Sequence, residues 1–247
     1  MSTPSVAVEN LSKTFGGVKA VDHVSFVLEP GSVTGLIGPN GAGKTTLLNL
    51  LTGVFAPSTG RIALAGKDMT GKRPHDMARA GVARTYQNLL LLDQDTVRDN
   101  VQIGRHRLGR KEASRSTEVV DDLLTLLDLA SISEAPVSGL PYGVRRRVEI
   151  ARALATDPDV LVLDEPTAGM TRDESDEIGQ LIKDVASRGT TVLLVEHNVR
   201  LVTEVCQDVM VLNWGALIGR TSASEVWELE EVRAAYLGSA ADWSPRA

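Results

Sequence analysis

The amino-acid sequence predicts an α/β fold with a mainly parallel sheet, and three observations support this prediction. A glycine-rich loop at residues 38–45 lies between a short buried strand and the first turns of a buried helix. Two nearly continuous apolar runs, at 160–163 and 191–195, are typical of parallel strands covered on both faces. A helical pattern at 174–186 lies between these runs and predicts a βαβ unit. By contrast, residues 95–155 show no strong strand pattern, which indicates a mainly helical insert.

The elements before the insert follow from short apolar runs and from turn residues. Proline and glycine mark turns at 29–32 and 57–60. We expect a helix to begin near Lys44, directly after the glycine-rich loop. The other predicted elements are strands at 6–8, 24–28, 33–37 and 61–64 and a helix at 75–80.

The insert and the segments after it are predicted in the same way. Inside the insert, apolar residues recur at helical spacing with aspartates between them, at Val119, Val120, Leu123, Leu124 and Leu127. A further strand is predicted at 209–212, and residues 239–247 read as a frayed tail. The sequence contains no internal repeat.

Length, charge and cysteine content limit the class of protein. The 247 residues can bury a full core, as one large domain or as a domain with a subdomain. A net charge of −6 argues against a general nucleic-acid binder, and the single cysteine excludes an internal disulfide. No apolar run approaches the roughly 18 residues that span a bilayer, and the first five residues lack a signal-peptide pattern. We therefore expect a cytoplasmic protein, which can still dock on a membrane complex.

The glycine-rich loop fits the phosphate-binding pattern G-x-x-x-x-G-K-[ST]. Polyphosphate needs several converging donors, and glycines let backbone N–H groups point inward without side chains in the way. The start of the following helix adds its positive dipole end. Lys44 is expected to reach the β- and γ-phosphates, and the Thr45 hydroxyl to hold Mg²⁺. The residues predicted to contact the nucleotide here are Gly38, Pro39, Asn40, Gly41, Ala42, Gly43, Lys44, Thr45 and Thr46.

Two carboxylates follow the apolar run at 160–163. Residues at the carboxyl end of such a strand face the ligand crevice beside the phosphate loop. Asp164 is expected to hold Mg²⁺, directly or through water, and Glu165 to orient or deprotonate the attacking water. His197 follows the next strand, where it can hydrogen-bond the γ-phosphate or the water. A polar histidine at a strand end is the alternative reading for His197.

In order and spacing, these motifs resemble the nucleotide-binding subunits of ABC transporters, over about residues 6–238. The resemblance implies that Gln87, in Arg-Thr-Tyr-Gln, touches Mg²⁺ or water and couples the site to a transmembrane partner. It assigns residues 140–144 to the signature loop, which closes on the partner subunit's ATP, and the residues after them to the helix that follows this loop. It also implies that Phe15 stacks on adenine, since an aromatic ring offers an apolar platform to the face of the base. A core phenylalanine is the alternative reading of Phe15.

The signature loop departs from the family's usual Leu-Ser-Gly-Gly-Gln. Pro141 and Tyr142 replace Ser-Gly, and Val144 replaces the glutamine. The serine hydroxyl is absent, so only backbone N–H groups near Gly143 can serve the nucleotide. Thr171 stands where many members carry the aspartate of the loop between subunits. The resemblance still implies that Pro141, Tyr142 and Gly143 form the signature part of the nucleotide site.

With these departures, the signature loop resembles that of one branch of the family, the ATPases of branched-chain amino-acid importers. Close relatives of this branch move urea or short amides. The further matching features are Arg-Thr-Tyr-Gln, Ala-Gly-Met and a terminal Ala-Tyr-Leu-Gly at 235–238. The resemblance implies a P-loop NTPase (RecA-like) core with an antiparallel β subdomain and an inserted helical subdomain. It divides residues 6–238 into a core at 6–87 and 156–238 and a helical subdomain at 88–155. It also implies ATP and Mg²⁺ as ligands and a place on the inner face of the cell membrane. The implied partners are permease subunits, a second ATPase subunit and, indirectly, an extracytoplasmic binding protein.

Two other classes of protein remain as alternatives. A non-transport ABC ATPase acting on ribosomes or DNA usually carries two ATPase domains or long coiled-coil inserts, and this sequence has neither. The other alternative is a phosphate-loop kinase or GTPase. A guanine-binding protein normally contains an Asn-Lys-x-Asp motif, which does not occur in this sequence. We therefore expect an ATPase that energises solute import through membrane partners.

Overall fold

The computed structural model describes residues 3, 5–107, 116–226, 228 and 232 of the chain. The predicted tail at 239–247 and the terminal Ala-Tyr-Leu-Gly at 235–238 lie outside the described residues. The strands are β1 (Val6–Phe15), β2 (Val18–Leu28), β3 (Val33–Ile37), β4 (Thr59–Leu64), β5 (Lys67–Asp68), β6 (Val82–Arg84), β7 (Val160–Asp164), β8 (Thr191–Val195), β9 (Asp208–Asn213) and β10 (Ala216–Ser222). The α-helices are α1 (Lys44–Leu51), α2 (Pro74–Arg79), α3 (Val97–Ile103), α4 (Ser116–Leu126), α5 (Tyr142–Leu154), α6 (Arg172–Ser187) and α7 (Val199–Val205).

The central sheet has the strand order β10-β9-β3-β8-β7-β6. All neighbouring pairs from β9 to β6 are parallel, and only β10 runs antiparallel to its neighbour β9. The strands β7 and β8 are adjacent and parallel with α6 between them in sequence, which confirms the predicted βαβ unit. Because β3, β7 and β8 lie side by side, the loops at their carboxyl ends meet at one edge of the sheet.

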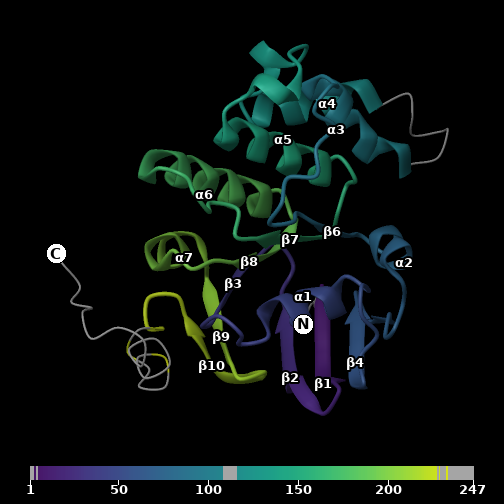
Figure 1. Ribbon diagram of the computed structural model, residues 1–247, viewed down its shortest axis with the longest axis vertical. Coiled ribbons are helices and arrows are strands. Elements are labelled where there is room, and N and C mark those ends of the chain that lie inside the picture. Colours follow the sequence, from purple (N-terminus) through teal and green to yellow (C-terminus); the bar gives the residue numbers. More distant parts are fainter. Residues whose placement is uncertain (1–2, 4, 108–115, 227, 229–231, 233–247) are drawn as a thin grey trace.

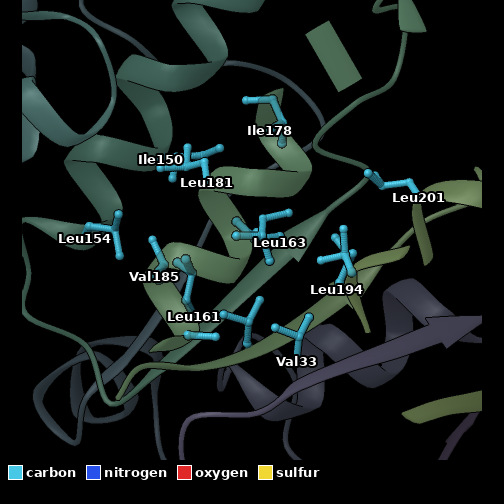
Figure 2. Packing of buried hydrophobic residues seen from close by; sticks show 14 of the residues in the cluster. Val33, Ile150, Leu154, Leu161, Leu163, Ile178, Leu181, Val185, Leu194 and Leu201 are labelled. Carbon is cyan, nitrogen blue, oxygen red and sulfur yellow. The ribbon is translucent and has the colours of Figure 1, made fainter. Parts of the chain in front are cut away.

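Two hydrophobic clusters lie on opposite faces of the central sheet, and this explains the continuous apolar runs. Leu161 and Leu163 of β7 belong to the cluster formed with α5, α6 and α7. Val160 and Val162 belong to the cluster on the other face, formed with α1 and the strands of the second sheet. Figure 2 shows the first cluster, in which side chains of the strands meet those of α6. A strand that packs on both faces needs apolar residues at every position.

A second sheet of order β2-β1-β4-β5 is antiparallel throughout. It lies at one end of the molecule, and the helices α3, α4 and α5 lie at the other end (Figure 1). A short 3-10 turn follows α3 at Gly104–Arg107, and two more lie at Ala130–Ile132 and Val137–Gly139. Among the described residues from 95 to 155 no strand forms, as predicted.

All strands and helices that the sequence predicted are present, and five further strands or α-helices were not individually predicted. These are β5, β6, β10, α3 and α7. The strands β5 and β6 have only two and three residues, too few to show a period. In β10 every residue is exposed or only partly buried, so it lacks an apolar run. Among the described residues, no helix is both long and apolar enough to cross a membrane.

Candidate active site

The candidate site is a cleft of 480 Å³ at the carboxyl edge of the central sheet. Its lining includes the phosphate loop and three of the predicted functional side chains, which come from distant parts of the sequence. The lining residues are Val18, Lys19, Ala20, Asn40, Gly41, Ala42, Gly43, Lys44, Thr45, Thr46, Gln87, Glu165, His197, Trp214 and Gly215. The fold therefore brings Lys44, Gln87, Glu165 and His197 to one place.

Close backbone contacts explain the glycines at both ends of the phosphate loop. A Cβ atom on Gly38 would lie 2.1 Å from the carbonyl oxygen of Leu212, at the end of β9. A Cβ on Gly43 would lie 2.3 Å from the carbonyl oxygen of Ala20, and Gly43 has a φ of 102°. Gly43 is the N-cap of α1, and no side chain caps this helix. The first N–H groups of α1 can therefore donate to an anion, as a phosphate-binding loop requires.

Lys44 is buried in this cleft and is held by the loop itself. Its Nζ donates to the carbonyl oxygens of Gly38, at 2.6 Å, and of Pro39, at 3.1 Å. Burial lowers the pKa of the Lys44 ammonium, and the nearby carboxylates of Glu165 and Asp164 offset part of that effect. The ammonium can exchange these carbonyl contacts for phosphate oxygens by turning within its own loop.

Asp164 ends β7 and accepts a hydrogen bond from Arg84 Nη2 at 2.8 Å. The same guanidinium donates through Nη1 to Oδ1 of Asn49, at 2.7 Å. Among the described residues, no group of three or more His, Cys, Asp or Glu could form a metal site alone. One carboxylate and the exposed Thr45 hydroxyl nevertheless fit Mg²⁺, which binds through few protein oxygens together with substrate phosphates. No local sequence pattern indicated Arg84 as the partner of Asp164.

Glu165 lies between two other predicted side chains. Its Oε1 is 2.7 Å from Nε2 of His197, and its Oε2 is 3.5 Å from Nε2 of Gln87. The Glu165 backbone has a φ of 48°, and its N–H donates to the carbonyl of Val195 in β8. A non-glycine residue in this region costs free energy, and such residues cluster at functional sites. The carboxylate is thus half-buried, oriented on both oxygens and open to the cleft.

Glu196 was not among the predicted site residues, but it supports two of them. It is 3% exposed and lies at the end of β8, directly before His197. Its Oε1 accepts from the N–H and the hydroxyl of Thr167, and its Oε2 from the N–H of His197. Glu196 therefore ties the loop after Glu165 to the loop that carries His197. The sequence signal that could have identified Glu196 is its place directly after an apolar strand, because a buried carboxylate needs hydrogen-bond donors around it.

The signature residues Pro141, Tyr142 and Gly143 do not line this cleft. Pro141 is the N-cap of α5, and Tyr142 and Gly143 form its first turn. Gly143 is buried against Glu174, whose Oε1 would lie 3.0 Å from a Cβ at this position. Thr171 is the N-cap of α6, where its hydroxyl and the Glu174 carboxylate form a capping box. The threonine that replaces the family's aspartate thus has a structural task.

Phe15, predicted to stack on adenine, lies outside the lining of the cleft. Its ring packs edge-on against Phe55, with centroids 5.2 Å apart, and remains 42% exposed. The lining of the cleft also includes Val18 and the 85% exposed Trp214. No local sequence pattern indicated Trp214, because it lies in the turn between β9 and β10, far along the chain from the phosphate loop.

Comparison with known proteins matches the family described as ABC transporter over residues 21–168. The high-affinity branched-chain amino acid transport ATP-binding protein BraF of Pseudomonas aeruginosa is 36% identical to this chain. The protein of the same description named LivG is 37% identical in Salmonella typhimurium and 36% identical in Escherichia coli. Each of these alignments covers 97% of this chain and 100% of the relative.

Solved structures give a similar result. An ATP-binding cassette of an ABC transporter in its ADP conformation superposes with a TM-score of 0.87 and 31% sequence identity. A nucleotide-free ATP-binding cassette from an ABC transporter gives a TM-score of 0.85 at 30% identity. Both comparisons cover 96% of this chain and 100% of the solved chain.

Proposed function

This chain belongs to the ABC transporter family of ATP-binding proteins, and on that premise we propose that it hydrolyses ATP to drive import of branched-chain amino acids. One observation supports the proposed hydrolysis of ATP. Lys44, Gln87, Glu165 and His197 come from four separate segments and line one cleft around the phosphate loop. The choice of solute is supported by the two relatives BraF and LivG, branched-chain amino acid transport proteins that match over nearly the full chain.

In the proposed mechanism the phosphate loop and the start of α1 bind the polyphosphate, and Lys44 neutralises charge on its terminal groups. Glu165 accepts a proton from the attacking water, which lies in line with the γ-phosphate. His197 and Gln87 hold the Glu165 carboxylate in position through separate oxygens. Thr45, Asp164 and Gln87 would hold Mg²⁺, which would supply positive charge against the developing phosphate charge. In this structure Arg84 contacts the carboxylate of Asp164.

We place the permease contact at a second groove, of 520 Å³, between α2, β6 and α5. Tyr86 and Leu90 of the glutamine loop line this groove and are 40% and 59% exposed. Exposed apolar side chains beside polar ones are typical of a protein-binding surface. A helical segment of a permease that fills the groove would press on the loop that carries Gln87, one residue after Tyr86. This contact would connect movement of the permease to the cleft.

The second ATPase subunit is proposed to be a paralogue rather than a second copy. The loop at 140–144 lacks the serine hydroxyl and the glutamine of the family's usual signature. A lost charge-assisted contact costs about 1.5–3 kcal/mol, enough to leave a homodimer sparsely populated. A partner with the full signature would complete the site at this chain's own Lys44. Light scattering of Glu165→Gln with Mg-ATP tests this, and a stable homodimer at micromolar concentration would contradict it.

Transport itself tests the proposed function. The chain is reconstituted in vesicles with the permeases and binding protein encoded by adjacent genes and with the paralogous ATPase. Uptake of labelled leucine, isoleucine and valine is then measured. We expect uptake that requires ATP on the side of this chain and that Glu165→Gln abolishes. ATP-dependent uptake of urea or acetamide without these amino acids would assign a different solute. ATP hydrolysis that no solute or permease stimulates would indicate a non-transport ATPase.

A further inference from the structure

Arg146 of the signature helix α5 is a charged side chain with no exposed surface at all. An arginine is rarely buried to this extent unless its charge is paired. Its ion-pair partner is Glu149, one turn further along α5, at 2.5 Å and 3% exposed. Removing either partner would leave a buried charge without compensation. The position of this pair in the fold therefore indicates what it does.

The guanidinium of Arg146 is directed at the main chain of the loop that carries Gln87. Its Nη1 donates to the carbonyl oxygen of Tyr86 at 2.9 Å, and its Nη2 to that of Gln87 at 3.3 Å. Nη2 also donates to the hydroxyl of Tyr142, in the first turn of α5, at 2.9 Å. One side chain thus joins the signature turn, its own helix and the glutamine loop.

Two neighbours on α5 act on the same loop. Oε1 of Glu149 accepts from the N–H of Tyr86 at 3.2 Å, and Nη1 of Arg152 donates to the carbonyl of Leu90 at 2.5 Å. Residues 146, 149 and 152 are spaced by three along the helix, so each is a neighbour of the next. Together they contact the main chain at both ends of the segment 86–90.

We propose that Arg146 is a positioning residue, which holds the glutamine loop to the signature helix so that Gln87 stays beside Glu165. Arg146 does not line the nucleotide cleft, and it acts through Gln87. A shift of α5 would carry the main chain of residues 86 and 87 with it, so the signature turn and Gln87 respond together. This inference rests on the proposed role of Gln87 in hydrolysis.

The test compares Arg146→Gln and Arg146→Lys with Arg147→Gln. Arg147 lies on the same helix and carries the same charge, but it pairs with Glu177 of α6 instead of with the loop. Hydrogen exchange in the full chain should become faster at residues 86–91 in both Arg146 variants, while peptides of the central sheet are unchanged. Arg147→Gln should leave the loop unchanged. Unaltered exchange of the loop in folded Arg146→Lys would overturn the proposal, whether or not Arg146→Gln folds.

A double-mutant cycle with Gln87→Ala adds a kinetic readout in the reconstituted complex. Arg146→Gln should lower kcat about tenfold or more in the wild-type background, because a small misplacement of a catalytic group is costly. In the Gln87→Ala background it should change kcat by less than about twofold, since both changes act at one group. Equal losses in both backgrounds would overturn the proposal. If Gln87→Ala keeps the wild-type kcat, the proposed role of Gln87 fails, and the exchange measurement still decides the role of Arg146.

Discussion

His197, which follows β8, directs Nε2 to Oε1 of Glu165, which follows β7, and the two atoms are 2.7 Å apart. The other carboxylate oxygen of Glu165 faces Gln87. Because the two neighbours approach different oxygens, the carboxylate has one orientation towards the cleft. In this arrangement His197 orients the carboxylate of Glu165, and Glu165 accepts the proton from water in the proposed mechanism. Mutation of each residue can test these two roles separately.

His197→Ala should reduce kcat by about a hundredfold, the size of effect expected when one positioned donor is removed. ATP affinity should change little, because the phosphate loop remains intact. Steady-state hydrolysis and nucleotide titration of the same preparation measure both quantities. His197→Gln, which retains a side-chain hydrogen-bond donor, should recover part of the rate. If it is as slow as His197→Ala, then donating a hydrogen bond to Glu165 is not the main role of His197.

Lys44→Ala should weaken ATP binding by about ten- to a hundredfold, as expected for the loss of a charge-assisted contact worth 1.5–3 kcal/mol. Thermal unfolding should change little, because Lys44 Nζ contacts carbonyl oxygens only within its own loop. Nucleotide titration and a melting curve test the two parts. Lys72→Ala, which removes an equal charge from an exposed turn, serves as the control and should bind ATP normally.

Thr171→Ala should lower the free energy of unfolding by about 1 kcal/mol, because it removes the N-cap of α6 and half of its capping box. Thr171→Asp should be nearly neutral, since aspartate is an equally good N-cap. Urea unfolding measures the difference. Thr125→Ala, an exposed threonine inside α4, is the matched control. A large effect of Thr171→Asp would show that capping is not the main task of Thr171.

Stability should depend on pH through Glu149. Burial raises the pKa of the Glu149 carboxyl, and the charge of Arg146 offsets part of the rise. The folded chain therefore holds this proton more tightly than the unfolded chain. The resulting stabilisation is full below the unfolded pKa and is lost as pH rises through the folded pKa.

Glu149→Gln cannot ionise, so the stability of the wild type relative to this variant should fall as pH rises above the unfolded pKa of the carboxyl. Chemical unfolding of both proteins at several pH values gives this difference. A difference that is constant across the range, or that grows with pH, would contradict the assignment. Any difference between the protonated carboxyl and the amide shifts the comparison by a constant amount and does not change its slope with pH.

The sequence predicted the family and fold that the comparisons support, and it predicted most elements of the central sheet. The strands β3, β7 and β8 were predictable because burial on both faces imposes a local apolar run. The short strand β6 and the half-exposed β10 carry no such pattern. Those strands form because neighbours in the sheet pair with them.

For the site, the phosphate loop was visible as one continuous motif, whereas its supports were not. Arg84 pairs with Asp164, 80 positions away, and Arg146 reaches the loop of Gln87, 59 positions away. No local period encodes such contacts, because they depend on how distant elements pack. Each of the three arginines at 145–147 forms an ion pair, and two of the partners come from outside α5. The adenine contact of Phe15 remains a prediction.

The most direct test of the account is single-turnover hydrolysis of saturating Mg-ATP by the wild-type chain and by Glu165→Gln, each assembled with its partners. Glutamine keeps the shape of the side chain but cannot accept the proton, so hydrolysis should slow at least about a hundredfold while ATP affinity is retained. Turnover close to wild type with normal ATP binding would contradict the role of Glu165 and move the base elsewhere, with His197 as the next candidate.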